Sequence, residues 1–272
     1  MQKIEFIKMH GLGNDFVIID KRSTNIKITE NLIKKLSNRR TGAGCDQLIT
    51  INQNNNINAD VAIEIFNPSG DRAEACGNGT RCVAKLLFDE NQKIDSLKIL
   101  SDAGILIAKQ NDVNISINMG EISSDWKTIP LSEEIDTFNI PIKVDGFSKG
   151  VAVNVGNPHV VFFGNSIENI DLENLGPKIE NNKFFPNKTN VEFIEIINSE
   201  KIKMKVWERG AGITLACGSG ACAAVYAGWK KNLIKNNVEV QLEKGSLHIN
   251  IINNEAIMTG PAEISYNGYV KI

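Results

Sequence analysis

The sequence has no long apolar run and no excess of one charge. No segment approaches the roughly 20 consecutive apolar residues that a membrane-spanning helix needs, and the opening MQKIEFIKMHGLGNDF lacks the apolar stretch of a secretory signal. The formal net charge of −2 provides no basic surface for nucleic acid. We therefore expect a cytoplasmic protein that acts on a small molecule, with no nucleic-acid partner and no membrane partner.

Signatures of cofactors, metals and disulfides are also missing. The sequence contains no P-loop, no dinucleotide-binding glycine motif and no signature of a pyridoxal-phosphate lysine, so we expect no organic cofactor. Five cysteines are an odd number in a chain without a secretory signal, which favours reduced thiols. The spacings Cys76 to Cys82 and Cys217 to Cys222 are not those of structural zinc sites, so we expect no metal.

What the sequence does contain is a repeated cysteine turn. The segments ACGNGTRC (75–82) and ACGSGACA (216–223) place Cys76 and Cys217 141 positions apart (217 − 76). GNDF (13–16) recurs as GNPH (156–159) at an offset of 143 (156 − 13). We predict two equivalent halves, residues 1–119 together with 263–272, and residues 120–262. Each half would contribute one cysteine to an active site between them.

Period-two alternation of apolar residues dominates the secondary-structure prediction. The predicted strands cover residues 59–66, 113–119, 191–197, 201–207 and 238–242. The predicted helices cover residues 30–37, 80–90, 167–175, ended by Gly176-Pro177, and 219–231. The Asn-rich residues 52–58 are predicted to be a hairpin loop. Many strands, with one long helix after each cysteine, indicate an α+β fold of two pseudo-symmetric domains, each a mainly antiparallel sheet around a central helix.

The cysteine turns also predict a chemistry. A thiol directly before a helix has backbone N–H groups and the positive helix end to stabilise its thiolate. Two opposed thiols can remove a proton from one face of an α-carbon and return one to the other face, which inverts that centre. The N–H groups of Gly77-Asn78 and Gly218-Ser219 are candidates to bind the substrate carboxylate beside the carbanion.

Other residues divide into packing and site candidates. Cys45, Cys82 and Cys222 lack the glycine-rich context and are interpreted as packing residues. Glu208-Arg209 precede a glycine-rich stretch eight residues before Cys217. Arg209 is suited to a bidentate carboxylate contact and Glu208 to an ammonium group, so we expect a substrate with a second amino-acid head.

Several motifs together resemble the diaminopimelate epimerase family. They are HGLGNDF, FNPSG, ACGNGTRC, GNPH, TNVEF and WERGAG running into TLACGSGACA, in the family's order from His10 to Ala223. The resemblance implies the fold given above and a cofactor-independent epimerase that interconverts L,L- and meso-diaminopimelate. It also implies a place in lysine and peptidoglycan-precursor biosynthesis, and a homodimer.

The resemblance assigns site residues as well. Cys76 and Cys217 are the proton donor and acceptor, and His159 and Glu208 aid their ionisation. The remaining positions contact the substrate: Asn14, Gln47, Asn67, Gly77, Asn78, Asn157, Asn190, Glu208, Arg209, Gly218 and Ser219. Ile213 stands where the family often has Glu, and Cys45 where it often has Phe, which bears on fine substrate tuning.

Three alternatives are weighed at this stage. Proline and hydroxyproline racemases share the two cysteines, but their first motif has a His where this chain has Asn78, and a cyclic substrate leaves Glu208 and Arg209 unused. An isomerase branch of the fold lacks both cysteines and is disfavoured here. The non-enzymatic alternative is an amino-acid-binding protein in which Cys76 and Cys217 form a redox-sensing disulfide.

Overall fold

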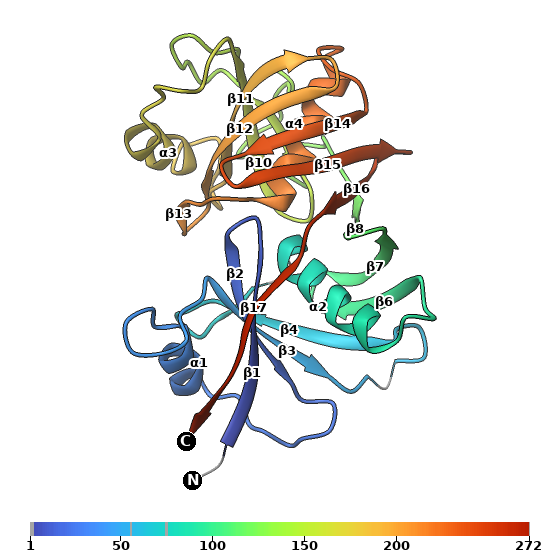
Figure 1. The fold of residues 1–272 in the computed structure, drawn as a ribbon. Helices are drawn as coiled ribbons and strands as arrows, with labels where there is room; N and C mark the ends of the chain where they lie inside the picture. Colours follow the sequence, from blue (N-terminus) through green and yellow to red (C-terminus); the bar gives the residue numbers. More distant parts are fainter. Residues whose placement is uncertain (1–2, 55, 74–75, 272) are drawn as a thin grey trace. The chain divides into compact units, whose positions relative to one another are not determined.

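The computed structural model describes residues 3–54, 56–73 and 76–271 (Figure 1). Position 55 of the predicted Asn-rich loop and Ala75 of the first cysteine motif lie outside these residues. The chain forms two compact units. Unit 1 comprises residues 1–117 and 260–272, and unit 2 comprises residues 118–259.

Unit 1 is a sheet with two helices. Its elements are β1 (Lys3–Gly11), β2 (Asn14–Asp20), α1 (Glu30–Ser37), β3 (Gln47–Asn52), β4 (Val61–Phe66), β5 (Arg72–Ala73), α2 (Gly77–Glu90), β6 (Ser96–Ser101), β7 (Gly104–Asn111) and β17 (Glu263–Lys271). Antiparallel pairs join β17 to β1, β1 to β2, β3 to β4, β4 to β5 and β6 to β7. The pairs β2–β3 and β4–β6 are parallel.

Unit 2 repeats this order. Its elements are β9 (Val151–Asn154), β10 (Pro158–Gly164), α3 (Leu172–Glu180), β11 (Asn190–Asn198), β12 (Lys201–Glu208), β13 (Gly212–Ile213), α4 (Gly218–Lys230), β14 (Asn237–Leu242) and β15 (Gly245–Ile252). Strands β8 (Asn114–Glu121) and β16 (Glu255–Gly260) contain the points at which the chain passes from one unit to the other. The pairs β10–β11 and β12–β14 are parallel, and β9–β10, β11–β12 and β14–β15 are antiparallel.

Strand for strand, the pairings β1 to β7 of unit 1 match the pairings β9 to β15 of unit 2. In both units a short strand, β5 or β13, precedes the helix that follows the cysteine. The strand after that helix, β6 or β14, pairs in parallel with the strand before the short one, β4 or β12. The predicted α+β fold of two pseudo-symmetric halves is confirmed.

The helices after the two cysteines are the central ones. α2 packs against β1, β2 and β7, and α4 packs against β9, β10, β11, β14 and β15. Most residues of both helices are buried, and the buried part of α4 consists largely of alanine and glycine. Small side chains on most of its surface allow a helix to be covered by sheet on several sides.

The predicted strands are confirmed, with ends shifted by one or two residues. In β4 buried and half-buried residues alternate as period two requires. The predicted hairpin around the Asn-rich loop is confirmed by the antiparallel pairing of β3 with β4. Three of the predicted helices also match, since α1 has the predicted bounds and α2 and α4 begin earlier by three residues and one.

The prediction for the third helix is wrong in position. α3 begins at Leu172, and it continues through Gly176-Pro177 to Glu180. Asp171 caps it by accepting a hydrogen bond from the Asn174 amide at 3.1 Å. Gly176 lies against the indole of Trp207, where an added Cβ would be 2.4 Å from Cδ2. The glycine is present for this close approach, and Pro177 removes only one amide donor from a short helix.

Candidate active site

Both cysteines cap the helix that follows them in the same way. Cys76 has extended backbone angles, and its sulfur accepts a hydrogen bond from the Gly79 amide at 3.4 Å. Cys217 is also extended, and its sulfur accepts from the Gly220 amide at 3.4 Å. Each sulfur therefore occupies the position of an N-cap oxygen, where helix amides favour negative charge.

The glycines in these turns are required by space. A Cβ on Gly79 would be 2.5 Å from Ile49 Cδ1, and a Cβ on Gly220 would be 2.8 Å from Glu192 Oε1. Neither glycine has a positive φ. Glycine is therefore required at these two positions because there is no room for a side chain behind the thiols. The backbone angles of the two residues do not require it.

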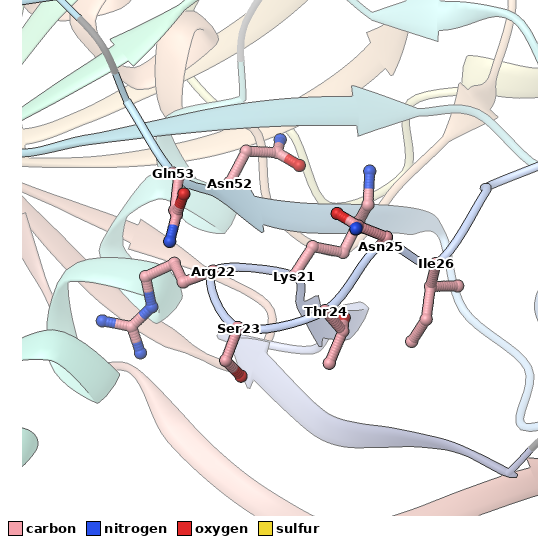
Figure 2. A pocket seen from close by; sticks show the side chains of 8 residues that line it. All are labelled: Lys21, Arg22, Ser23, Thr24, Asn25, Ile26, Asn52 and Gln53. Carbon is pink, nitrogen blue, oxygen red and sulfur yellow. The ribbon is translucent and has the colours of Figure 1, made fainter.

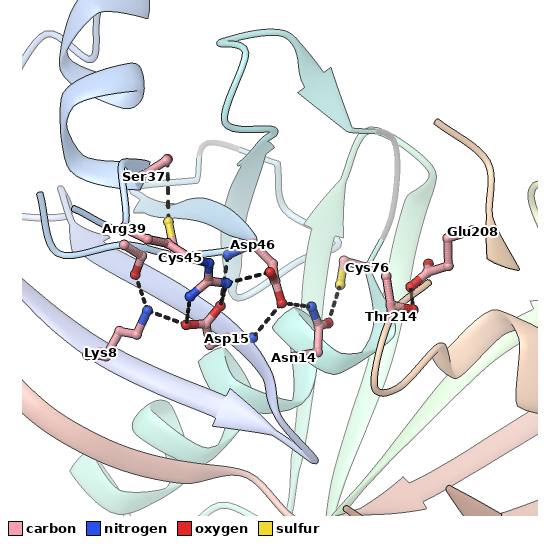
Figure 3. Close-up of polar contacts among 11 residues, drawn as sticks. Lys8, Asn14, Asp15, Ser37, Arg39, Cys45, Asp46, Cys76, Glu208 and Thr214 are labelled. Atoms are coloured by element: carbon pink, nitrogen blue, oxygen red, sulfur yellow. Dashed lines mark hydrogen bonds and ion pairs between the residues drawn. The ribbon is translucent and has the colours of Figure 1, made fainter. Parts of the chain in front are cut away.

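Amides surround Cys76. Its thiol donates to Asn14 Oδ1 at 3.8 Å, and the same oxygen accepts from Asn78 Nδ2 at 3.1 Å. The Asn14 amide nitrogen donates to Asp46 Oδ2 at 2.9 Å, so Asp46 fixes which end of Asn14 faces the thiol (Figure 3). Gln47 Nε2 donates to Asn67 Oδ1 at 3.2 Å. The structure thus brings Asn14 and Asn78 to Cys76, and pairs Gln47 with Asn67.

The carboxylates on this side are paired with cations. Arg39 donates to Asp15 at 2.7 and 2.9 Å and to Asp46 at 2.6 Å, and Lys8 donates to Asp15 at 2.6 Å (Figure 3). Burial opposes ionisation of Asp15, but the hydrogen bonds from Arg39 and Lys8 outweigh it and lower the pKa of Asp15 to about 2. Sequence analysis did not identify this network, although Asp15 stands in the motif HGLGNDF and Asp46 directly follows Cys45.

Carboxyl groups surround Cys217. The thiol is 3% exposed, its sulfur lies 3.6 Å from Ser219 Oγ, and Glu208 accepts a hydrogen bond from Thr214. Burial raises the pKa of Glu208. Burial also raises the pKa of the Cys217 thiol, the charges of Glu208 and Glu192 raise it further, and the hydrogen bonds from Ser219 and Gly220 act in the opposite direction.

His159 is fixed from both sides of its ring. Nδ1 lies 2.7 Å from Glu192 Oε1, and Nε2 lies 2.8 Å from Asn157 Oδ1. His159 and Glu192 are both fully buried. Sequence analysis did not identify Glu192 as a site residue, although it predicted that Asn190, in the same motif TNVEF, contacts the substrate. A single acidic residue between Val191 and Phe193 in a buried strand is a signal that could have identified it.

The remaining predicted residues of unit 2 lie at the ends of β10, β11 and β12. Asn190 Oδ1 accepts from the Arg209 amide at 2.8 Å, and Asn190 Nδ2 donates to the Pro158 carbonyl at 2.8 Å. The Arg209 guanidinium is on the surface and donates to the Asn187 carbonyl at 3.4 Å. Asn190 therefore fixes the backbone from which Arg209 projects.

A hollow of about 510 Å³ lies elsewhere in unit 1 (Figure 2). Residues of the β2–α1 loop and around the end of β3 line it, all of them polar except Ile26: Lys21, Arg22, Ser23, Thr24, Asn25, Ile26, Asn52 and Gln53. None of the predicted site residues is among them.

The three remaining cysteines are buried, as packing residues are. Burial raises the pKa of Cys82 to about 12 and also raises the pKa of Cys45. Both thiols are therefore protonated at neutral pH. In residues 3–54, 56–73 and 76–271, no helix is long and apolar enough to cross a bilayer.

Comparison with known proteins gives consistent results. The family model for diaminopimelate epimerase matches residues 6–124 and 151–265. The diaminopimelate epimerase of Pelagibacter ubique is 44% identical over 278 residues, covering 99% of each chain.

Solved structures show the fold alone, because their sequences are distant. A phenazine biosynthesis PhzF-family protein of Enterococcus faecalis has a TM-score of 0.71 at 14% identity, with 100% of both chains covered. A hydroxyproline epimerase of Agrobacterium vitis has a TM-score of 0.66 at 12% identity, with 98% of this chain and 92% of that one covered.

Proposed function

Because this chain belongs to the diaminopimelate epimerase family, we propose that it is an isomerase that interconverts L,L- and meso-diaminopimelate without an organic cofactor. The observation that carries the proposal is the identical capping of two helices by Cys76 and Cys217, one in each unit. The family's reaction requires two acid/base groups, and the two halves of the chain each provide one.

In the proposed reaction one cysteine starts as a thiolate and the other as a thiol. The thiolate removes the α-proton and becomes a thiol, while the electron pair of the C–H bond moves toward the adjacent carboxylate. The second thiol then gives its proton to the opposite face and becomes the thiolate. One proton is taken and one returned, so the net charge of the pair is unchanged.

Cys217 is the proposed base toward the L,L isomer, an assignment that rests on the family. Burial and the charges of Glu208 and Glu192 raise the pKa of its thiol, so its ionisation requires a proton acceptor. Glu208 has a raised pKa and a hydrogen-bonding thiol neighbour in Cys217, so its carboxylate can accept the thiol proton. The thiol of Cys76 instead donates to the amide oxygen of Asn14, which favours the protonated, acidic form. His159 is the proposed second group that aids thiol ionisation.

The two cysteine turns are also the proposed binding site for the reacting carboxylate of the substrate. Amides at the starts of α2 and α4, from Gly77-Asn78 and Gly218-Ser219, are the proposed donors to the reacting carboxylate. Arg209 is the proposed contact of the distal carboxylate. The amide side chains of the site are the proposed readers of the distal centre: Asn14, Gln47, Asn67, Asn157 and Asn190. A wrongly configured head would leave such buried groups unpaired.

We further propose that the enzyme works in the cytoplasm as a homodimer, and that it supplies lysine and peptidoglycan-precursor biosynthesis. These proposals rest on the family alone.

The test is proton exchange. Freshly reduced enzyme is incubated with L,L-diaminopimelate in D₂O, and the α-proton signal is followed by NMR, with L-proline as the control substrate. We expect loss of the diaminopimelate α-proton together with formation of the meso isomer, and no change in proline. Exchange of proline alone would assign the chain to the racemase activity, and exchange of neither would contradict the proposed chemistry.

A further inference from the structure

Behind the proposed site, β10 and β11 hold a buried carboxyl–imidazole pair. The imidazole, His159, has a role in the proposed reaction, whereas the carboxyl group, Glu192, has none. The two strands are parallel neighbours, and they place Glu192 Oε1 2.7 Å from His159 Nδ1. Both side chains are 0% exposed. A hydrogen bond in such surroundings constrains the ring more strongly than one in water.

The geometry determines how many protons the pair carries. Nε2 of His159 faces the amide oxygen of Asn157 at 2.8 Å, so Nε2 carries a proton and donates it. Another proton lies between Nδ1 and Glu192 Oε1. Whether nitrogen or oxygen holds it, the pair has no net charge, which is the condition under which ionisable groups are tolerated in a core.

Two further observations separate this carboxyl from one retained for stability. Oε2 of Glu192 is buried and, within the described residues, has no hydrogen-bond partner, which is unfavourable for folding. Glu192 also adjoins the cysteine turn, since a Cβ on Gly220 would lie 2.8 Å from its Oε1 and 3.3 Å from Cys217 Sγ. An apolar residue at this position of β11 would avoid the unpaired oxygen.

We propose that Glu192 is a positioning residue for the epimerisation: it holds His159 through Nδ1 and thereby keeps a proton on Nε2, the nitrogen that faces Asn157. The proposal rests on the function proposed above. Glu192 touches neither substrate nor reacting atoms in this role. It acts through the imidazole, whose ring it holds from Nδ1.

The test compares Glu192→Gln with Glu195→Gln. Both residues are glutamates of β11, but Glu195 accepts from the Ile167 amide and lies near Lys203. Glutamine at 192 keeps the size of the side chain but can either donate to or accept from Nδ1, so it no longer selects one tautomer. We expect Glu192→Gln to lower kcat by about tenfold or more with KM changed by less than about twofold, and Glu195→Gln to leave both unchanged.

The second readout does not depend on turnover. The chain has three histidines, so the ¹⁵N signals of His159 can be assigned in substrate-free enzyme with His10→Gln and His248→Gln. We expect a protonated Nε2 in the wild type and a mixture of tautomers in Glu192→Gln.

Wild-type kcat in Glu192→Gln, or an unprotonated Nε2 in the wild-type protein, would overturn the proposal. If Glu192→Gln fails to fold, the wild-type spectrum alone decides. Failure of the proposed function is distinguishable, because the wild-type enzyme would then show no turnover of diaminopimelate while its His159 signals still report on the pair.

Discussion

The two cysteine turns are alike in backbone and opposite in surroundings. Cys76 and Cys217 each accept from the amide three residues on, at the same 3.4 Å. Around Cys76 the acidic residues Asp15 and Asp46 are paired with Arg39 and Lys8. Around Cys217, Glu192 is buried and Glu208 is half-buried, and the pKa values of both are raised.

The difference shows how a repeated unit can carry out an asymmetric task. The shared turn provides what both thiols need, which is a helix N-terminus and a close approach of backbone. The residues behind the turn then decide where protons are held. The carboxylates of Asp15 and Asp46 near Cys76 are held by cations, and Asp46 orients an amide, whereas burial raises the pKa values of the carboxyl groups near Cys217.

The largest expected effect tests what the two turns share. Cys76→Ala and Cys217→Ala each remove one of the two acid/base groups, so we expect each to lower kcat by a factor on the order of 10⁴. Steady-state racemisation assays measure this. Cys45→Ala is the matched control, since that thiol is buried and has a raised pKa, and it should retain turnover. Wild-type rates in either active-site variant would contradict the two-thiol mechanism.

The next effect is confined to the Cys217 side. Glu208→Gln keeps the contact with Thr214 but removes the group that accepts a proton, so we expect kcat to fall by about 10²-fold. The pH–rate profile should also lose one ionisation. Glu239→Gln, a carboxyl on β14 bonded to Ser246 and Lys201, serves as the control. An unaltered pH–rate profile in Glu208→Gln would contradict the proposal that a carboxyl group beside Cys217, unlike those beside Cys76, accepts a proton.

On the Cys76 side a stability effect is expected. The pKa of Asp15 is depressed to about 2 from 3.8, so its contribution is present above about pH 4 and is lost as the pH falls through about 2. Allowing for solvent screening, Asp15→Asn should lower the free energy of unfolding by about 1–2 kcal/mol at pH 7.

Urea denaturation at a series of pH values measures this contribution. The difference between Asp15→Asn and the wild type should shrink as the pH approaches 3. Asp102→Asn, which disrupts only a surface pair with Arg72, should cost less than about 1 kcal/mol. A pH-independent difference for Asp15→Asn would show that its charge does not contribute.

The smallest effect concerns orientation. Asp46→Ala frees the Asn14 amide to turn its nitrogen toward Cys76, so we expect kcat/KM to fall by about three- to tenfold without loss of stability beyond about 1 kcal/mol. Asp60→Ala, in a loop whose carboxylate accepts from the Lys98 amide, is the control. Equal kcat/KM values in the two variants would mean that the orientation of the Asn14 amide does not depend on its hydrogen bond to Asp46.

Much of the fold could be predicted from the sequence, because the signals that determine it are local. The repeated turn, the period-two strands and the helix after each cysteine all lie within short windows, and the structure has them. α3 was misplaced because its boundaries depend on the Asp171 cap and on packing of Gly176 against Trp207, which is 31 residues away (207 − 176).

The site was predictable only in part, for a similar reason. Arg39 reaches Asp15 because β2 and β3 pair in parallel and bring Asp46 alongside Asp15, a relation that no sequence spacing encodes. The sequence also does not show why residue 220 is a glycine: the Glu192 carboxyl, from another strand, leaves no room for a Cβ there. A single sequence does not show which side chains of distant strands come into contact.

The pairing of β17 with β1 bears on how the chain is synthesised and folded. The ladder places Lys3 opposite Lys271 and His10 opposite Glu263, so β1 can complete its sheet only after the much later β17 has been synthesised. The second unit is continuous in sequence and needs no such partner. During translation it can fold as an autonomous body, while the first remains open along one edge until synthesis reaches residues 263–271.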